Sequence, residues 1–352
     1  MKNSHHPSDT HTPFTTEHTM QNVAPAATST TTNDDLATCN HAPAIDMRLA
    51  HCGGAVQGGW QLGWAQVIGC HHPRICEDSV ASRLATPPAP TPNPAAPRQD
   101  HGQDSPIQAA LLAVADGVGG GARGDIASAA LAAHCVGMPE ALLGNPQAMA
   151  QWLQLAEAQV QHQLRQVSYS PGAATLAAAW LWPEPPTLAR QHSAAQSTWH
   201  KSYPTGMQGY LLRIGDARLY VYDGQHVSGL SADQTYAHLR ETPPDGATPD
   251  DPARMVGTGF TGELELVPLH LPAGHTLLLC SDGLHRGLDE AAMAALLQGS
   301  DDLATTALQM AQAARLAGSE DDISVLLARY PPMESGSTPG SHGLAGFLRK
   351  FF

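Results

Sequence analysis

The most regular feature of the chain is a series of short apolar runs, each about as long as a β-strand and bounded by Gly, Asp or Pro. These runs cover residues 59–69, 109–117, 173–182, 209–214, 218–224, 275–283 and 322–330. Only Gly215-Asp216-Ala217 separates the runs 209–214 and 218–224. The pattern therefore predicts seven strands, with a β-hairpin at that turn.

A second set of segments has apolar residues at helical spacing. It covers residues 125–136, 146–167, 289–298 and 302–317. Strands joined as hairpins, with the helices in blocks between them, favour an α+β layered domain over a repeated βαβ array. We find no internal repeat of solenoid period.

Four segments lack this patterning. Residues 1–45 contain ten threonines and five histidines but few large apolar residues, which predicts a disordered tail. The proline-rich stretch 85–106 and the irregular stretch 183–207 are predicted insertions within one domain spanning 46–331. The C-terminal tail, 332–352, ends in "GFLRKFF". This end can contact a membrane or a partner, although its short length favours folding back onto the domain.

The amino-acid composition argues against several classes of protein. Lys+Arg number 18 against Asp+Glu 32, a net charge of -14, which argues against nucleic acid as a partner. The six cysteines show no CxxC spacing, so neither a zinc site nor a disulfide scaffold is indicated. The N-terminus lacks an apolar leader and no run is long enough to span a membrane. These features predict a cytoplasmic protein.

Aspartates stand at the edges of the predicted strands. Asp116 ends "LLAVADG", Asp282 ends "LLLCSDG", Asp216 lies in the predicted hairpin turn, Asp321 precedes the last strand, and Asp78 begins another candidate strand. If these carboxylates converge, they need a counter-charge, and divalent cations supply one. Oxygen ligands without Cys or His favour Mg²⁺ or Mn²⁺.

Each aspartate also has a structural interpretation. A single Asp-Gly is more often a turn or a helix cap than a metal ligand, so a metal site is indicated only because Asp116 and Asp282 occur together. Asp216 suits a tight turn equally well. Asp321 competes with Asp322 and Glu320 for any role.

Several blocks resemble one protein family when taken in order. They are "ICEDSV", "LLAVADGVGGGARGDIASAAL", "GAATLAAAWL", "GYLLRIGDARLYVYDG", "GLSADQTY", "LLLCSDGL" and "GSEDDISVLLAR". Their order and spacing over residues 47–330 resemble the metal-dependent protein phosphatases, the type 2C serine/threonine phosphatases, particularly the bacterial branch. The resemblance implies a four-layer α-β-β-α sandwich with two packed antiparallel sheets.

The resemblance also implies a mechanism and a set of site residues. Asp78, Asp116 and Asp282 would be catalytic, and a water activated by two or three Mn²⁺ or Mg²⁺ ions would attack phosphorus. The metal ligands would be Asp78, Asp116, the carbonyl of Gly117, Asp216, Asp282 and Asp321. The expected partners are proteins phosphorylated on serine or threonine and an opposing bacterial serine/threonine kinase.

Three positions depart from the family pattern. The expected phosphate-binding arginine lies five residues before the first metal aspartate, whereas Arg74 lies four before Asp78. Cys76 replaces the usual Asn, and Gln234 stands where a His is common. Cys280 is expected to be a strand residue and not a nucleophile. The intact aspartates favour an active protein phosphatase; the alternatives are an inactive regulatory module that binds a signalling partner and a phosphatase of small metabolites.

Overall fold

The computed structural model describes residues 49–70, 75–87, 107–118, 123–167, 170–184, 206–260 and 264–331. The two predicted tails, and most of the two predicted insertions, lie outside these residues. The predicted domain boundaries therefore stay predictions. No helix within the described ranges is long and apolar enough to cross a membrane.

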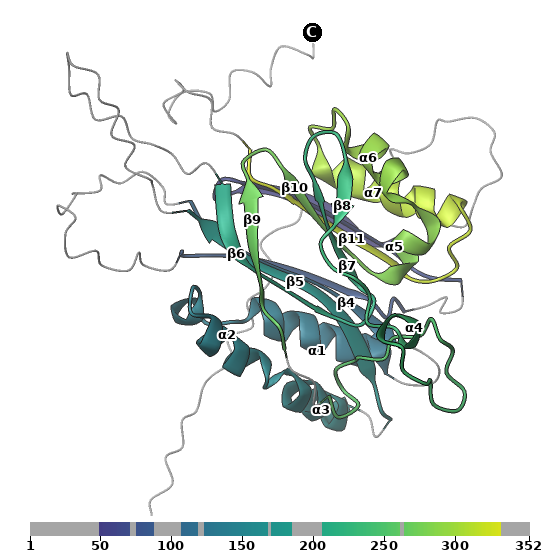
Figure 1. Cartoon of the computed structure of the whole chain (residues 1–352). Helices are drawn as coiled ribbons and strands as arrows, with labels where there is room; N and C mark the ends of the chain where they lie inside the picture. The colour runs from purple at the N-terminus through teal and green to yellow at the C-terminus, as the bar shows by residue number, and fades with distance from the viewer. Residues whose placement is uncertain are drawn as a thin grey trace, which may run out of the picture. The chain divides into compact units, whose positions relative to one another are not determined.

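Eleven strands among the described residues form two antiparallel sheets (Figure 1). The six-stranded sheet has the order β1, β2, β11, β10, β7, β8, and the five-stranded sheet has the order β3, β4, β5, β6, β9. In chain order the strands are β1 (Leu49–Gln57), β2 (Trp60–Val67), β3 (Ser79–Ala85), β4 (Ala109–Val118), β5 (Ala173–Pro183), β6 (Gly206–Ile214), β7 (Arg218–Tyr222), β8 (Val227–Gly229), β9 (Val267–Pro272), β10 (Thr276–Cys280) and β11 (Ile323–Arg329).

Helices cover the outer face of each sheet (Figure 1). The five-stranded sheet packs against α1 (Gly124–Val136), α2 (Pro146–Leu153) and α3 (Ala156–Val167). The six-stranded sheet packs against α5 (Asp282–Gly287), α6 (Glu290–Leu297) and α7 (Leu303–Leu316). The 3₁₀ turn Glu140–Leu142 and the short α4 (Tyr236–Leu239) lie in connections.

The continuous apolar runs arise because the inner strands are buried on both faces. In β4, Leu111 and Ala113 face the helices, while Leu112 and Val114 face the other sheet. A third core cluster, which includes Leu278 and Met310, lies between the six-stranded sheet and its helices. Successive side chains of a strand point to opposite faces, so one run serves two layers. The predicted α+β four-layer sandwich is confirmed.

The predicted β-hairpin at Gly215-Asp216-Ala217 is wrong. β6 pairs with β5 and β9 in one sheet, whereas β7 pairs with β10 and β8 in the other. The chain crosses between the sheets at Gly215, whose φ of 84° favours glycine. Both strands bury apolar side chains between the sheets, so their sequences resemble a hairpin although the strands do not pair.

Two predicted elements have different ends from those expected. The helix predicted over 146–167 is two helices, because α2 ends at Leu153 and α3 begins at Ala156. The run 275–283 is strand only to Cys280; Asp282 begins α5 instead of lying in a turn. β1, β8 and β9 have no counterpart among the predicted strands, and all three lie at sheet edges.

Candidate active site

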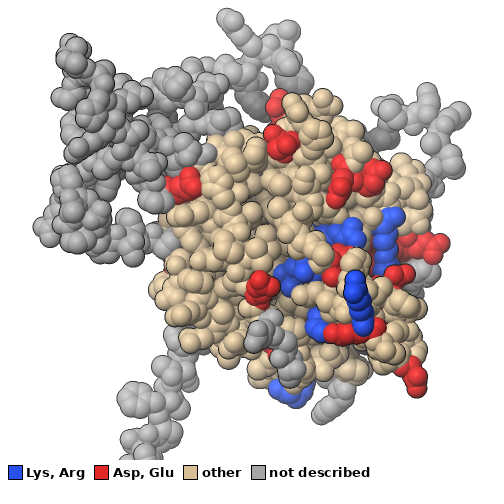
Figure 2. All heavy atoms as spheres, viewed as in Figure 1, with Lys and Arg blue, Asp and Glu red and all other residues tan. Residues whose placement is uncertain are grey.

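Four of the five predicted metal aspartates line a cleft at one end of the two sheets, and the fifth, Asp78, does not line it. The cleft has a volume of about 590 Å³, and Asp116, Asp216, Asp282 and Asp321 line it. We call it the acidic cleft. In Figure 2, Lys, Arg, Asp and Glu side chains gather over α4, α5 and the segment that follows α4, whereas most of this face is uncharged.

Asp116 interacts with the other four predicted metal aspartates. It lies near the end of β4, and its Oδ2 accepts a long hydrogen bond, 3.4 Å, from the backbone N–H of Asp282. Burial and the negative charges of four carboxylates raise the pKa of Asp116 well above its usual value; the four are Asp282, Asp78, Asp216 and Asp321. The five predicted aspartates therefore share one electrostatic environment.

Asp78 is also buried. It precedes β3 and is 5% exposed, and its Oδ2 is buried without a hydrogen-bond partner among the described residues. Burial, followed by the charge of Asp322, raises the pKa of Asp78, while hydrogen bonds from Ser281 and Ser324 oppose the rise. An orphaned buried carboxylate oxygen is costly unless a cation or proton satisfies it.

Asp216 lies at the crossing between β6 and β7, and two side chains fix the backbone there. Gln234 accepts a hydrogen bond of 2.9 Å from the N–H of Gly215, and the ring Nε2 of His285 lies 3.0 Å from the carbonyl of Asp216. Burial raises the pKa of Asp216 to about 6. Gln234, which the sequence left without a role, holds the turn that carries a predicted metal ligand.

Asp282 is the first residue of α5, directly after the buried strand β10. Burial, followed by the charge of Asp321, raises the pKa of Asp282 to about 7, and Arg286 opposes this rise. The carboxylate Oδ2 lies 2.6 Å from Nη2 of Arg286, one helical turn further along. Arg286 was not among the predicted site residues, although its i, i+4 spacing from Asp282 is visible in the sequence.

The structure separates the roles of Asp321 and Asp322. Asp322 is 3% exposed, and its two oxygens accept hydrogen bonds of 2.5 Å from the N–H groups of Gly69 and Glu77. Asp321 lines the cleft and lies 3.3 Å from Arg286. Asp322 therefore fixes the backbone around the cleft, while Asp321 presents a carboxylate to it.

Gly117 follows Asp116 and also lines the acidic cleft. A Cβ at this position would lie 2.3 Å from the carbonyl oxygen of Glu77 and 2.6 Å from Gly124. Only glycine fits so close an approach of three backbone segments.

Two further predictions concern Arg74 and Cys280. Arg74, the predicted phosphate-binding residue, lies outside the described residues and stays a prediction. Cys280 is fully buried in β10, and burial raises the pKa of its thiol. A thiol held protonated and out of contact with solvent is a poor nucleophile, which agrees with its interpretation as a strand residue.

The sequence did not indicate the segment that forms one wall of the acidic cleft, residues 244–255. Pro244, Asp245, Asp251 and Met255 line the cleft, as does Thr175 of β5. Residues 244–255 carry no regular helix or strand, so no hydrophobic period distinguishes them. Their link to the sheet is made by Val256, which exchanges two backbone hydrogen bonds of 2.9 Å with Ala174.

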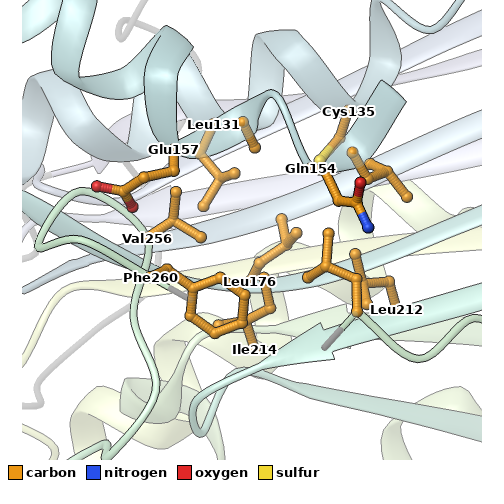
Figure 3. Close-up of a pocket in the computed structure, with 12 residues that line it drawn as sticks. Leu131, Cys135, Gln154, Glu157, Leu176, Leu212, Ile214, Val256 and Phe260 are labelled. Atoms are coloured by element: carbon orange, nitrogen blue, oxygen red, sulfur yellow. The ribbon is translucent and has the colours of Figure 1, made fainter. Parts of the chain in front are cut away.

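A second cavity lies between the five-stranded sheet and its helices. It has a volume of about 200 Å³, and Leu131, Leu176, Ile214 and Phe260 are among its lining residues; we call it the apolar cavity (Figure 3). Figure 3 shows Glu157 and Gln154 on opposite sides of this space. The lining offers few polar groups, so it suits no phosphoryl chemistry.

Glu157 connects the apolar cavity to the segment after the acidic cleft. Its carboxylate accepts hydrogen bonds of 2.6 and 2.7 Å from the N–H groups of Gly257 and Gly259. Both glycines have positive φ, which leaves their N–H groups free to point at one side chain. Glu157 thus holds the chain just beyond residues 244–255.

The donor chemistry of the acidic cleft fits a divalent metal ion. Four aspartates line the cleft, Asp78 nearby has an orphaned buried oxygen, and hard ions such as Mg²⁺ and Mn²⁺ prefer oxygen. Within the part of the chain that the structure describes, however, no three His, Cys, Asp or Glu side chains are grouped closely enough to hold one ion. Instead, the guanidinium of Arg286 bridges Asp282 and Asp321.

The sequence matches the protein phosphatase 2C family over residues 94–319, more than half of the chain. The chain therefore belongs to this family, and its class is that of a protein-serine/threonine phosphatase. The match includes Asp116, Asp216 and Asp282, whereas Asp78 and Asp321 lie just outside it. The comparison with curated protein sequences finds no match.

Solved structures of bacterial phosphatases have the same fold. The serine/threonine phosphatase PstP of Mycobacterium tuberculosis is 20% identical, with a TM-score of 0.54 over 78% of this chain and 99% of that one. Stp1 of Staphylococcus aureus is 18% identical, with a TM-score of 0.53 over 81% and 99%. PppA of Pseudomonas aeruginosa, a regulatory component of the type VI secretion system, is 22% identical, with a TM-score of 0.51 over 77% and 97%.

Proposed function

We propose that this chain is an active, metal-dependent phosphatase of phosphoserine and phosphothreonine in proteins. The observation that supports this most is the convergence of five aspartates at one end of the two sheets. Burial and mutual repulsion raise the pKa values of Asp78, Asp116, Asp216 and Asp282, so the cluster needs a cation at neutral pH. The family to which the chain belongs is metal-dependent.

The proposed ligands are the carboxylates of Asp78, Asp116, Asp282 and Asp321 and the carbonyl of Gly117. Asp216, with Asp282, would serve a third ion. When bound, Mn²⁺ or Mg²⁺ ions supply an acidified water as the nucleophile and offset the charge of the phosphoryl oxygens. The buried oxygen of Asp78 would gain the partner that it lacks among the described residues.

The chain itself positions these groups. Asp322 fixes the loops that carry Gly69 and Glu77, Gln234 fixes the turn at Asp216, and the burial of Cys280 leaves no thiolate to compete as a nucleophile. The proposed phosphate-binding residue is Arg74. No covalent phosphoenzyme is required by this arrangement.

The proposed substrate is a phosphorylated serine or threonine on a protein. The acidic cleft is open to solvent and its volume of about 590 Å³ accommodates a phosphorylated side chain with part of its peptide. The opposing kinase and the cytoplasmic location inferred from the sequence stay predictions.

Hydrolysis of a phosphothreonine peptide and of a sugar phosphate by the purified chain with Mn²⁺ would test this proposal. We expect a higher kcat/KM for the peptide. Preference for the sugar phosphate would instead identify a phosphatase of small metabolites. Binding of the peptide without turnover, with metal demonstrably bound, would identify a regulatory module.

A further inference from the structure

One basic residue stands inside the acidic cleft. Arg286 is the only Lys, Arg or His among the described residues that line it. It lies on α5, one turn after Asp282, so the two side chains share a face of the helix. Its Nη2 lies 2.6 Å from Oδ2 of Asp282, and its Nη1 lies 3.3 Å from Oδ2 of Asp321.

The charge of Arg286 is the local counter-charge of the cleft. Partial burial acts to lower the pKa of its guanidinium, but the carboxylates of Asp282, Asp321, Asp216 and Asp116 outweigh this and raise it. The side chain is 50% exposed, whereas that of Asp282 is 10% exposed. The guanidinium thus reaches from the solvent side onto a carboxylate that is largely buried.

Other arginines near the cleft have a different environment. Arg315 donates to the backbone carbonyls of Ile68 and Asp321, and Arg218 binds both oxygens of Asp233 at 2.8 and 2.6 Å. These two arginines hold the fold. The hydrogen bonds and ion pairs found for Arg286 among the described residues go to Asp282 and Asp321 alone, which are both proposed metal ligands.

We propose that Arg286 competes with a divalent cation for Asp282 and Asp321. This inference rests on the proposed function, because it takes these carboxylates as metal ligands. The oxygens that Arg286 contacts are the donor atoms that an ion would take, and a guanidinium and a divalent ion repel each other at such distances. Binding of the ion therefore requires Arg286 to turn outward, for which its exposed side has room.

The consequence is a metal site with a reduced affinity. Asp282 and Asp321 exchange one cation for another, so the free energy of breaking two ion pairs is subtracted from the free energy of metal binding. Partly exposed ion pairs of this kind correspond together to roughly a three- to tenfold change in affinity. Arg286 thereby sets the metal concentration at which the site fills.

Titration calorimetry of Mn²⁺ into the chelated full-length chain tests this inference without any assay of activity. The variants are Arg286→Gln and Arg286→Met, which remove the charge, and Arg286→Lys, which keeps it. Arg165→Gln, an exposed residue of α3, is the matched control for the loss of one positive charge. Thermal unfolding of each variant establishes that it is folded.

We expect Arg286→Gln and Arg286→Met to bind Mn²⁺ about three- to tenfold more tightly than the wild type. Arg286→Lys should lie between them and the wild type, and Arg165→Gln should match the wild type. An equal or weaker affinity of both neutral variants would overturn the inference and leave the metal site intact. Absence of Mn²⁺ binding in every folded variant would overturn the proposed function itself, and this inference with it.

Discussion

The acidic cleft lies at one end of the two sheets, whereas the apolar cavity lies between the five-stranded sheet and its helices, and adjacent residues contribute to each. Thr175 lines the cleft while Leu176 lines the cavity. In the same way, Met255 lines the cleft and Val256 lines the cavity. In the cleft, buried carboxylates repel one another, whereas the cavity has an apolar lining whose Glu157 is hydrogen-bonded. Unfavourable electrostatics, and not the mere presence of a cavity, therefore marks the candidate active site.

Asp282→Asn should reduce activity strongly, because it removes a proposed metal ligand. We expect metal-dependent hydrolysis to fall by at least about a hundredfold, because even outer-shell partners of a metal are worth about 10–100-fold. Hydrolysis of p-nitrophenyl phosphate with Mn²⁺ measures this, and circular dichroism checks the fold. Asp301→Asn, at an exposed position, is the control. Full activity of Asp282→Asn would contradict the site assignment.

The second prediction concerns the pH dependence of stability without metal. The pKa of Asp282 rises from 3.8 to about 7 on folding, so the folded state binds more protons than the unfolded state in that range. The free energy of unfolding should therefore fall as the pH rises from about 4 to 7, by about 1.4 kcal/mol for each unit.

Urea denaturation of the chelated chain at pH 5.5 and 7.5 measures this. The wild type should lose roughly 2 kcal/mol more than Asp282→Asn over this interval, because the variant has no carboxylate to ionise there. Saturating Mn²⁺ should restore the stability of the wild type at pH 7.5. An equal loss of stability in the wild type and in Asp282→Asn would contradict the raised pKa of Asp282.

A third prediction separates the two regions through Glu157. Glu157→Gln keeps the shape of the side chain but removes the charge that strengthens its bonds to Gly257 and Gly259. We expect the free energy of unfolding to fall by about 1–2 kcal/mol, with the affinity for Mn²⁺ unchanged. Denaturation and calorimetry measure the two quantities. A large change in metal affinity would mean that the regions are coupled.

The smallest expected effect comes from filling the apolar cavity. Val256→Ile adds one methylene at its lining and should raise the free energy of unfolding by about 0.5–1 kcal/mol. Val114→Ile makes the same change between the packed sheets, where overpacking should cost about 1–3 kcal/mol. Urea denaturation compares the two variants. Equal destabilisation would show that the cavity cannot accept the added group.

Much of the fold was predictable because the inner strands bury both faces. The runs that form β4, β5 and β11 are continuously apolar and are predicted correctly, whereas the edge strands β1, β8 and β9 are not predicted. The incorrect prediction of a hairpin at Gly215 shows that the pattern of apolar residues does not identify which strands pair. A tight turn and a crossing between two sheets have the same local sequence, and only pairing over long range distinguishes them.

The candidate site was predictable only in part, for a similar reason. Aspartates at strand ends are visible in the sequence, but residues 244–255 have no period that marks them as a wall of the cleft. The different roles of Asp321 and Asp322 arise because Asp322 accepts hydrogen bonds from the N–H groups of Gly69 and Glu77. These N–H groups belong to segments that are distant in the chain, so the sequence does not show which carboxylate they bind.

The most direct test of the central claim is hydrolysis of p-nitrophenyl phosphate after complete chelation, followed by the separate addition of Mn²⁺, Mg²⁺, Ca²⁺ or Zn²⁺. We expect no turnover in the chelated protein and recovery of turnover with Mn²⁺ or Mg²⁺. Inactivity with Mn²⁺ demonstrably bound, or full activity without metal, would contradict it.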